Sequence, residues 1–189
     1  MRIFILFTLF SLSLEGATFN YNVENEKSKM KINGTSFLHN WETKVEKLSG
    51  EGTFEIKKDK VLDIKTFYLK VDPLSIKSGN EGIDEKTHNA LRAQTYPVIR
   101  VSIINAKITD SGSKIEGRVD FFVGGITQSG TFLVDLTSPD RNSIIISGEK
   151  KLSMKSFQID PPSVMFFKAG DEVTVSFSLF LKIKEGQVK

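Results

Sequence analysis

The 189-residue sequence contains no cysteine. This absence excludes disulfide bonds, zinc–thiolate sites, iron–sulfur clusters and thiol catalysis. It does not identify the cellular compartment, because an exported domain of this size buries enough apolar surface to fold without crosslinks. Other residue types are scarce: there is one tryptophan and there are three tyrosines, against fifteen phenylalanines. Because phenylalanine carries apolar area without a polar atom, the composition indicates an oily interior.

An excess of one charge is also lacking. The 26 basic and 23 acidic residues are interleaved and leave a formal net charge of +3. No basic stripe emerges, so the sequence predicts no nucleic-acid partner despite a pI near 9.0.

The sequence has no apolar run long enough for a membrane span, which needs ~20 residues. Its longest, residues 3–14, follows Met1-Arg2 and ends at the small residues Gly16 and Ala17. This pattern predicts a signal peptide over residues 1–16, cleaved near Gly16 or Ala17, and a single domain over residues 17–189. With no cysteine after the run, lipoprotein processing is excluded. We therefore expect a periplasmic or secreted protein.

The strongest periodicity lies in residues 171–184, where apolar and polar residues alternate. The apolar set is Val173, Val175, Phe177, Leu179, Leu181 and Ile183. A period of two indicates a β-strand with one buried face. Something must cover this face, and the chain offers almost no helix to do so. The sheet must therefore cover itself, as a barrel or a sandwich.

Most of the remaining chain shows the same pattern. We predict further strands over residues 28–36, 42–48, 50–57, 61–71, 98–108, 114–123, 131–136 and 142–147, with turns at 110–113, 124–125 and 138–140, and an irregular crossing segment at 152–170. Asn33-Gly34 is interpreted as a bend or bulge within its strand. Residues 75–97 break the pattern and predict one short helix, capped by Asp84, in a long connection. The fold class is all-β, an antiparallel barrel of about eight strands.

A barrel of this size either packs its interior or holds one small ligand. Inward glycines at Gly50, Gly52 and Gly117 are expected to leave room. The candidate ligand-binding residues are the apolar residues on predicted inward positions and their neighbours near a mouth: His39, Trp41, Phe54, Ile56, Phe67, Leu69, Leu91, Phe121, Val123, Phe132, Val134, Phe166, Phe167, Val175, Phe177 and Leu179.

The two histidines offer little chemistry. His39, beside Trp41, either hydrogen-bonds a ligand oxygen at the barrel mouth or packs on Trp41 as a structural residue. His88 is expected to face solvent. The histidines are not at metal-ligand spacing, so no metal site is predicted. Ser111-x-x-Lys114 matches an S-x-x-K motif without its companion motifs, and no catalytic residue is predicted.

Three blocks carry a resemblance to a known family. They are Ser28-Lys29-Met30-Lys31-Ile32-x-Gly34-Thr35-Ser36-x-Leu38-His39-x-Trp41, then Leu74-x-Ile76-Lys77-Ser78-Gly79 with Asp84, Ala90-Leu91 and Tyr96-Pro97-x-Ile99, and finally Lys151-Leu152-x-Met154-x-x-Phe157-x-Ile159-x-Pro161-Pro162 with Lys168-x-Gly170-Asp171-x-Val173. In this order they resemble the YceI-like proteins over nearly the whole mature chain. Asn40, Ser156 and Gln158 depart from the family pattern.

The resemblance implies an extended, lipocalin-like barrel in the periplasm that holds a polyisoprenoid or similar amphiphile. The function expected is non-enzymatic binding or carriage of a polyprenyl or quinone-type lipid, with no cofactor besides that ligand. Two alternatives stay open: an enzyme acting on such a lipid, and a filled-core module that works through its surface. Transient membrane contact for lipid exchange and a homodimer are left open as further partners.

Overall fold

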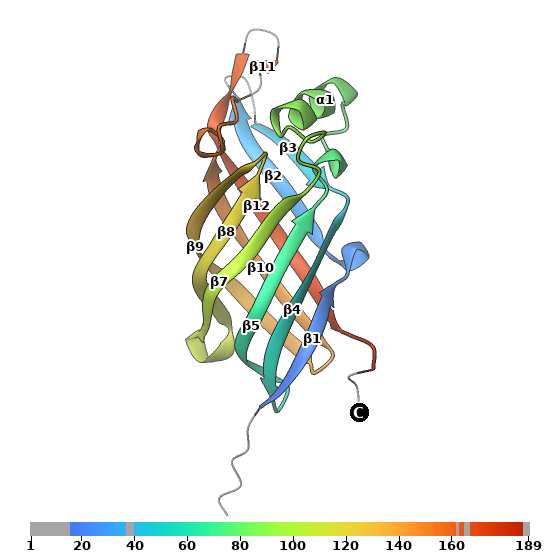
Figure 1. Ribbon diagram of the computed structural model, residues 1–189, viewed down its shortest axis with the longest axis vertical. Coiled ribbons are helices and arrows are strands. Elements are labelled where there is room, and N and C mark those ends of the chain that lie inside the picture. Colours follow the sequence, from blue (N-terminus) through green and yellow to red (C-terminus); the bar gives the residue numbers. More distant parts are fainter. Residues whose placement is uncertain (1–15, 37–39, 162, 165–166, 187–189) are drawn as a thin grey trace, which may run out of the picture.

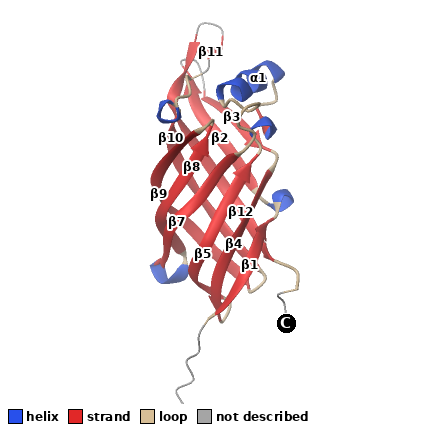
Figure 2. Cartoon of the chain, in the orientation of Figure 1, coloured by secondary structure: helices blue, strands red, loops and turns tan. Residues whose placement is uncertain are grey.

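The computed structural model describes residues 16–36, 40–161, 163–164 and 167–186. Twelve strands and one α-helix make up most of this part of the chain (Figures 1 and 2). The strands are β1 (Ala17–Val23), β2 (Lys29–Ser36), β3 (Asn40–Val45), β4 (Leu48–Lys57), β5 (Lys60–Val71), β6 (Ile76–Lys77), β7 (Ile99–Thr109), β8 (Lys114–Val123), β9 (Ile126–Asp140), β10 (Ser143–Ser153), β11 (Ser163–Val164) and β12 (Phe167–Ile183). The helix is α1 (Glu81–Ala90), and the 3-10 turns are η1 (Asn25–Lys27), η2 (Pro73–Ser75), η3 (Asp110–Gly112) and η4 (Lys155–Phe157).

The strands form a closed, eight-stranded antiparallel barrel, which confirms the predicted fold class. Closure depends on β12, which pairs with β10 along one edge and with β1 and β2 along the other. β1 and β2 therefore occupy one position in the barrel, and β4 and β3 occupy the next. From β4 the order continues through β5, β7, β8, β9 and β10 back to β12.

The helix lies at one end of the barrel, which is uppermost in Figure 1. β1 begins and β12 ends at the opposite, lower end. Side chains fill this lower part, and Tyr21, Phe54, Ile144 and Leu181 are fully buried there. The Tyr21 and Phe54 rings meet edge to face, with centroids 5.5 Å apart. The Tyr21 hydroxyl donates to the Arg141 carbonyl oxygen at 2.6 Å, so the buried phenol has its hydrogen-bond partner.

The alternation in the sequence predicts burial correctly for four of the six apolar residues of β12, while Val175 and Phe177 are only half-buried. Val173, Leu179, Leu181 and Ile183 are buried, while the alternate residues from Thr174 to Lys182 are half-buried or exposed. Gly34 lies inside β2, and the β2–β12 ladder shifts register next to it, between Ala169 and Val173. The prediction that the strand continues through Asn33-Gly34 is therefore confirmed. The extra residues of the irregularity lie on β12, however, where the four steps from Ala169 to Val173 face only two steps on β2.

Three strand predictions need correction. β1 was not predicted, although Phe19, Tyr21 and Val23 alternate there and are all buried. The proposed turn at 138–140 is wrong, because β9 runs through Pro139 to Asp140. Pairing with β10 shifts between Ser143 and Ile145, which leaves an extra residue on β9. A proline is tolerated at such a bulge because no ladder bond requires its missing N–H. β10 also continues to Ser153, six residues beyond the predicted end.

The helix is present, but Asp84 does not cap it. The side chain of Asn80 is the cap and accepts from the Ile83 backbone N–H at 3.2 Å. Asp84 lies inside the helix and is buried, where it accepts hydrogen bonds from Ser78 N and Oγ, both at 2.7 Å. Burial acts to raise the pKa of Asp84, but these hydrogen bonds and Lys77 outweigh it and hold the pKa below its ordinary value.

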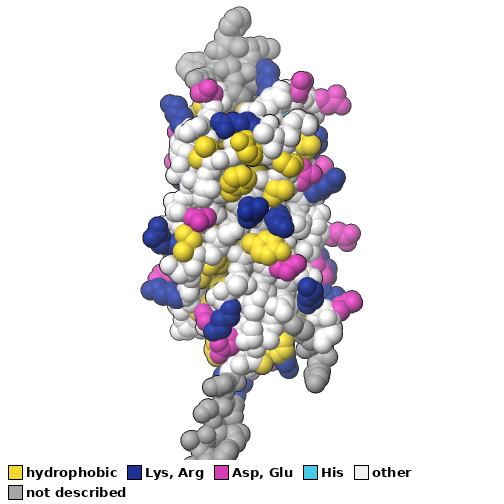
Figure 3. Space-filling model, in the orientation of Figure 1, with side chains coloured by type: hydrophobic (Ala, Val, Ile, Leu, Met, Phe, Trp, Pro, Cys, Tyr) yellow, Lys and Arg dark blue, Asp and Glu magenta, His cyan; other side chains and the backbone are white. Residues whose placement is uncertain are grey.

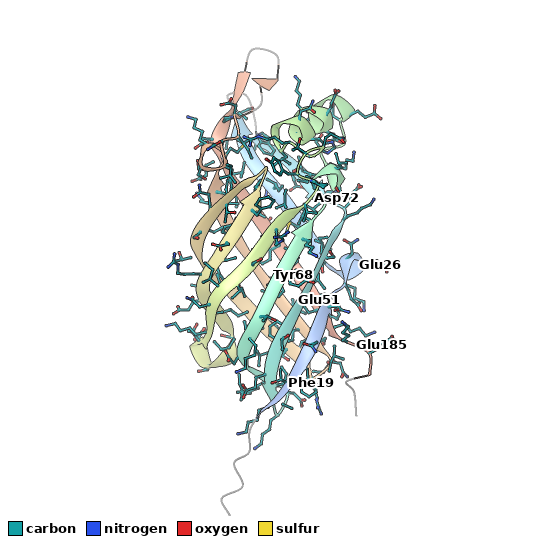
Figure 4. All side chains as sticks on the ribbon, in the orientation of Figure 1. Phe19, Glu26, Glu51, Tyr68, Asp72 and Glu185 are labelled. Atoms are coloured by element: carbon teal, nitrogen blue, oxygen red, sulfur yellow. The ribbon has the colours of Figure 1, made fainter. Side chains whose placement is uncertain are left out.

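The outer surface carries charges of both signs. Figure 3 shows Lys and Arg interspersed with Asp and Glu over one face of the barrel. Cross-strand partners such as Glu51 on β4 and Tyr68 on β5 lie side by side on the outside (Figure 4). Within the described residues, no helix combines the length and apolar character that crossing a membrane would require.

A pH-dependent stability follows from the burial of Tyr21. Burial raises the pKa of Tyr21 to about 12, against an ordinary value of 10.0. Between these values the unfolded chain loses the phenol proton while the folded chain keeps it. The free energy of unfolding should therefore fall with rising pH in this window, by at most ~1.4 kcal/mol per pH unit for this group.

Denaturant titrations of wild type and Tyr21→Phe between pH 9 and about 12 measure this effect. At neutral pH, Tyr21→Phe should lower the free energy of unfolding by about 1 kcal/mol, because the hydrogen bond to the Arg141 carbonyl is lost. Its stability should then decline less steeply than that of wild type above pH 10. Parallel pH profiles for the two proteins would contradict the assignment.

Candidate functional site

The upper part of the barrel encloses a cavity of about 250 Å³. Strands of the wall, α1 and the segment after β10 all line it. The lining residues are Met30, Ile32, Trp41, Thr43, Val45, Phe67, Leu69, Val71, Ile76, Thr87, Ala90, Leu91, Ile99, Val101, Ile103, Ile115, Val119, Phe121, Val123, Phe132, Val134, Ile146, Glu149, Lys150, Leu152, Ser153, Met154, Phe157, Ile159, Val173, Val175, Phe177 and Leu179. The barrel is therefore filled below and hollow above.

The cavity wall is almost entirely apolar. Glu149 and Lys150 are the only charged residues that line it, among the residues described. One water molecule needs a volume of ~10–15 Å³ and two to four polar partners. The volume is roughly twenty times larger, but the walls offer few such partners. This environment suits a hydrocarbon chain better than ordered water.

The side chains of His88 and Arg92 hold the helix over the upper end through three hydrogen bonds. The His88 ring Nε2 lies 3.0 Å from the Ile76 carbonyl oxygen. His88 is half-buried, so the expectation that it faces solvent is wrong. Arg92, just after α1, donates from Nη1 to the Gly124 carbonyl at 2.8 Å and from Nη2 to the Gln158 carbonyl at 2.7 Å. The two Arg92 bonds connect the C-terminal end of α1 to the β8–β9 hairpin and to the end of η4.

Trp41 lies against the backbone of Gly34, its cross-strand partner in β2. A Cβ atom built on Gly34 would lie 2.1 Å from Trp41 Cζ2, so only glycine leaves space for the indole. The indole Nε1 is buried and has no hydrogen-bond partner among the described residues. A buried donor without a partner is costly, so the indole is held in this place by packing and not by a hydrogen bond within the described residues.

Most of the predicted site residues come together in this cavity. Those that line it are Trp41, Phe67, Leu69, Leu91, Phe121, Val123, Phe132, Val134, Val175, Phe177 and Leu179. Phe54 and Ile56 do not line it, because both belong to the buried core of the filled part. Alternation predicts that a residue points inward but not at which height the barrel is hollow. His39, Phe166 and the side chain of Phe167 lie outside the described residues.

Other cavity residues were not proposed from the sequence. Val101 and Ile103 follow the inward phase of their strand, so alternation alone could have identified them. Met154, Phe157 and Ile159 follow β10 in a segment without periodicity, and no local signal places them over a cavity.

The inward glycines do not enlarge the cavity, contrary to expectation. None of Gly50, Gly52 and Gly117 lines it. A Cβ atom on Gly52 would lie 2.5 Å from Phe54 Cε2, and one on Gly50 would lie 2.5 Å from the Tyr68 carbonyl oxygen. On Gly117 it would overlap the Asn105 carbonyl oxygen, at 2.1 Å. Here glycine permits close packing of neighbouring groups instead of leaving empty space.

The S-x-x-K match lies away from the cavity, and the described residues hold no cluster for metal binding. Ser111 and Lys114 lie around the η3 turn, and neither lines the cavity. No group of three or more His, Asp or Glu side chains converges within the described part of the chain.

The sequence model of the YceI-like domain matches residues 21–181. The chain belongs to the YceI-like family. A comparison with curated protein sequences finds no match. Three solved structures have a similar fold. Burkholderia cenocepacia BcnA has a TM-score of 0.72 at 17% identity, covering 84% of this chain and 98% of its own.

The second structure is a polyisoprenoid binding domain from Saccharophagus degradans implicated in plant cell wall breakdown. Its TM-score is 0.69 at 12% identity, covering 88% of this chain and 99% of its own. The third, the Campylobacter jejuni YCEI protein, has a TM-score of 0.61 at 12% identity, covering 76% of this chain and 85% of its own. At these identities the likeness establishes the shared fold.

A charge on the inner wall should disrupt this YceI-like barrel. Phe177 lines the cavity between Gly148 on β10 and Met30 on β2. Phe177→Asp removes a phenyl group and places a carboxylate against apolar walls, so the free energy of unfolding should fall by about 3 kcal/mol or more. Ser178→Asp, on the outer face opposite Lys29, should change it by only about 0.5 kcal/mol. Urea denaturation of both variants measures the difference, and equal stabilities would show that the inside and outside assignments are wrong.

Proposed function

We propose that this chain binds a long-chain isoprenoid amphiphile, polyprenyl or quinone-type, and carries it without altering it chemically. The observation that carries this proposal is the apolar cavity of about 250 Å³ in the upper barrel. Membership of the YceI-like family supports it, as does the fold shared with a domain described as polyisoprenoid binding. A filled-core module is disfavoured, because side chains fill only the lower part of the barrel.

Apolar burial supplies enough affinity for this role. Each Å² of apolar surface removed from water contributes ~25 cal/mol, so a tail burying roughly 300 Å² gains on the order of 7 kcal/mol before ordering costs. The cavity volume lies just below the ~300–1,000 Å³ typical of ligand pockets. Such a cavity encloses a prenyl tail and little more, so the headgroup would lie at its edge.

The proposed setting is the bacterial periplasm. Support comes from the apolar run at residues 3–14 and the small residues at 16–17. The first residue of β1 is Ala17, so removal of residues 1–16 would leave every strand of the barrel complete. Transient membrane contact would then allow the lipid to be exchanged.

Native mass spectrometry of protein recovered from the periplasm of its own host tests both parts of this proposal. The expected protein mass lacks the first 16 or 17 residues, and an additional mass should be released on extraction and identified as an isoprenoid. Protein that is consistently empty, and that takes up no added geranylgeraniol, would refute the carrier. Chemically altered geranylgeraniol after incubation would instead identify an enzyme. Recovery of the full-length chain from the cytoplasm would refute export.

Filling the cavity provides an independent test. Val101 faces the cavity between Leu69 and Phe121, whereas Ser102 is next to it on the other face of β7. Val101→Phe should weaken geranylgeraniol binding at least fivefold and change the free energy of unfolding by less than about 1 kcal/mol, because the added ring enters empty space. Ser102→Phe should leave binding unchanged.

Trp41, the single tryptophan, lines the cavity, and its fluorescence provides the binding signal. In a packed interior, Val101→Phe would instead destabilise the protein by about 1–3 kcal/mol and leave the signal unaffected. That outcome would contradict the assignment of an empty cavity in the upper barrel.

A further inference from the structure

The hydrogen-bond ladder of the barrel is interrupted between β9 and β10. The two strands pair from Ser143–Asp140 to Ser147–Asp135 and no further. Above that point β9 pairs with β8 alone and β10 with β12 alone. We call the space between residues 126–134 of β9 and residues 148–153 of β10 the seam. It lies beside the cavity, since Phe132, Val134, Lys150 and Leu152 belong to the cavity wall.

A second, more polar cleft adjoins the cavity at the seam. It is lined by Asn105, Ala106, Lys107, Glu116, Gly117, Arg118, Thr131, Phe132, Leu133, Glu149 and Lys150. Phe132, Glu149 and Lys150 line both spaces. Leu133 on the outer side is 57% exposed, so the approach to the seam also has an apolar component. The seam is therefore a place where the apolar interior and a polar surface cleft meet.

Lys150 extends into this junction. It occupies the inward phase of β10, between Gly148 and Leu152, and is half-buried. Its Nζ donates to the Thr131 carbonyl oxygen across the seam at 2.8 Å. A Cβ atom on Gly130 would lie 4.0 Å from Lys150 Cε, within ordinary contact, so the lysine side chain passes beside Gly130 of β9.

The Lys150 ammonium has unused capacity for an anion. It forms no ion pair among the described residues, and one carbonyl uses only one of its three donors. Glu149 lines the same two spaces, but it is exposed and forms no ion pair with Lys150. By contrast, Lys151 lies on the outer face and pairs with Glu172 Oε1 at 2.9 Å. A cation beside apolar walls is costly unless an anion or water meets it.

We propose that Lys150 binds an anionic headgroup, a phosphate or a carboxylate, of the amphiphile whose tail occupies the cavity. This inference rests on the proposed lipid-binding function. The tail would lie against the apolar wall, and the headgroup would sit in the seam, where Lys150 Nζ donates a charge-assisted hydrogen bond to it. Neutral amphiphiles would bind through the tail alone.

The experiment compares three probes with the same tail: geranylgeranyl phosphate, geranylgeranoic acid and geranylgeraniol. Trp41 fluorescence gives their dissociation constants for wild type, Lys150→Met, Lys150→Arg and Lys151→Met. Lys150→Met should weaken binding of the two anions roughly tenfold and that of the alcohol less than twofold. Lys150→Arg should retain the preference for anions. Lys151→Met should leave the dissociation constants of all three probes unchanged.

Thermal unfolding of each variant shows whether it is folded. If Lys150→Met weakens binding of all three probes equally, Lys150 contributes only to the shape of the cavity wall, and the headgroup assignment is wrong. Unchanged binding of all three would also overturn it. Wild type should bind no inorganic phosphate; binding that Lys150→Met abolishes would show a free-anion site instead. If wild type bound no probe at all, the proposed function itself would fail.

Discussion

The fold depends on the pairing of β12 with strands on both of its edges. Its register with β10, β1 and β2 closes the barrel and directs its apolar residues inward. Because side chains alternate at every residue, a slip of one position would expose Leu179 and Leu181 and bury the polar set. The strong alternation of this strand thus specifies both the closure and the interior.

Closure alone does not create a cavity, and the two parts of the barrel differ in their packing. In the lower part, Tyr21 and Phe54 fill the interior, and the Tyr21 hydroxyl meets the Arg141 carbonyl. In the upper part the walls stand apart, and α1 with the segment around Phe157 covers the end. The lower part forms the packed hydrophobic core, while the upper part leaves space for a ligand.

The seam is a second consequence of how the barrel closes. A bulge at the lower end of β9 and the end of pairing at Ser147–Asp135 leave the two strand edges apart beside the cavity. Interrupted ladders expose backbone groups that must find other partners. Here the Thr131 carbonyl accepts a hydrogen bond from the Lys150 ammonium, and Gln128 Nε2 donates to the Ser156 carbonyl at 2.8 Å. A polar site is therefore placed at the rim of an apolar cavity.

The sequence alone determined the all-β class, the number of strands in the barrel and the inward phase of most strands, because a period of two is a local property. Residues such as Phe121, Phe177 and Leu179 could be assigned inward for this reason. The continuation of a strand through Asn33-Gly34 was also predicted correctly, but the bulge beside it lies on β12 and was not visible in the sequence.

Only the tertiary structure decided which inward residues surround empty space. Phe54 and Phe67 have the same local pattern, but Phe54 is packed by Tyr21 of the paired strand β1, distant in sequence, while Phe67 faces the cavity. The same holds for Gly52, whose neighbour Phe54 occupies the space that a side chain would take. The place where β9 and β10 separate, and hence the setting of Lys150, also depends on contacts between segments far apart in the chain. Local periodicity fixes the direction of a side chain, but packing across the barrel fixes what that side chain meets.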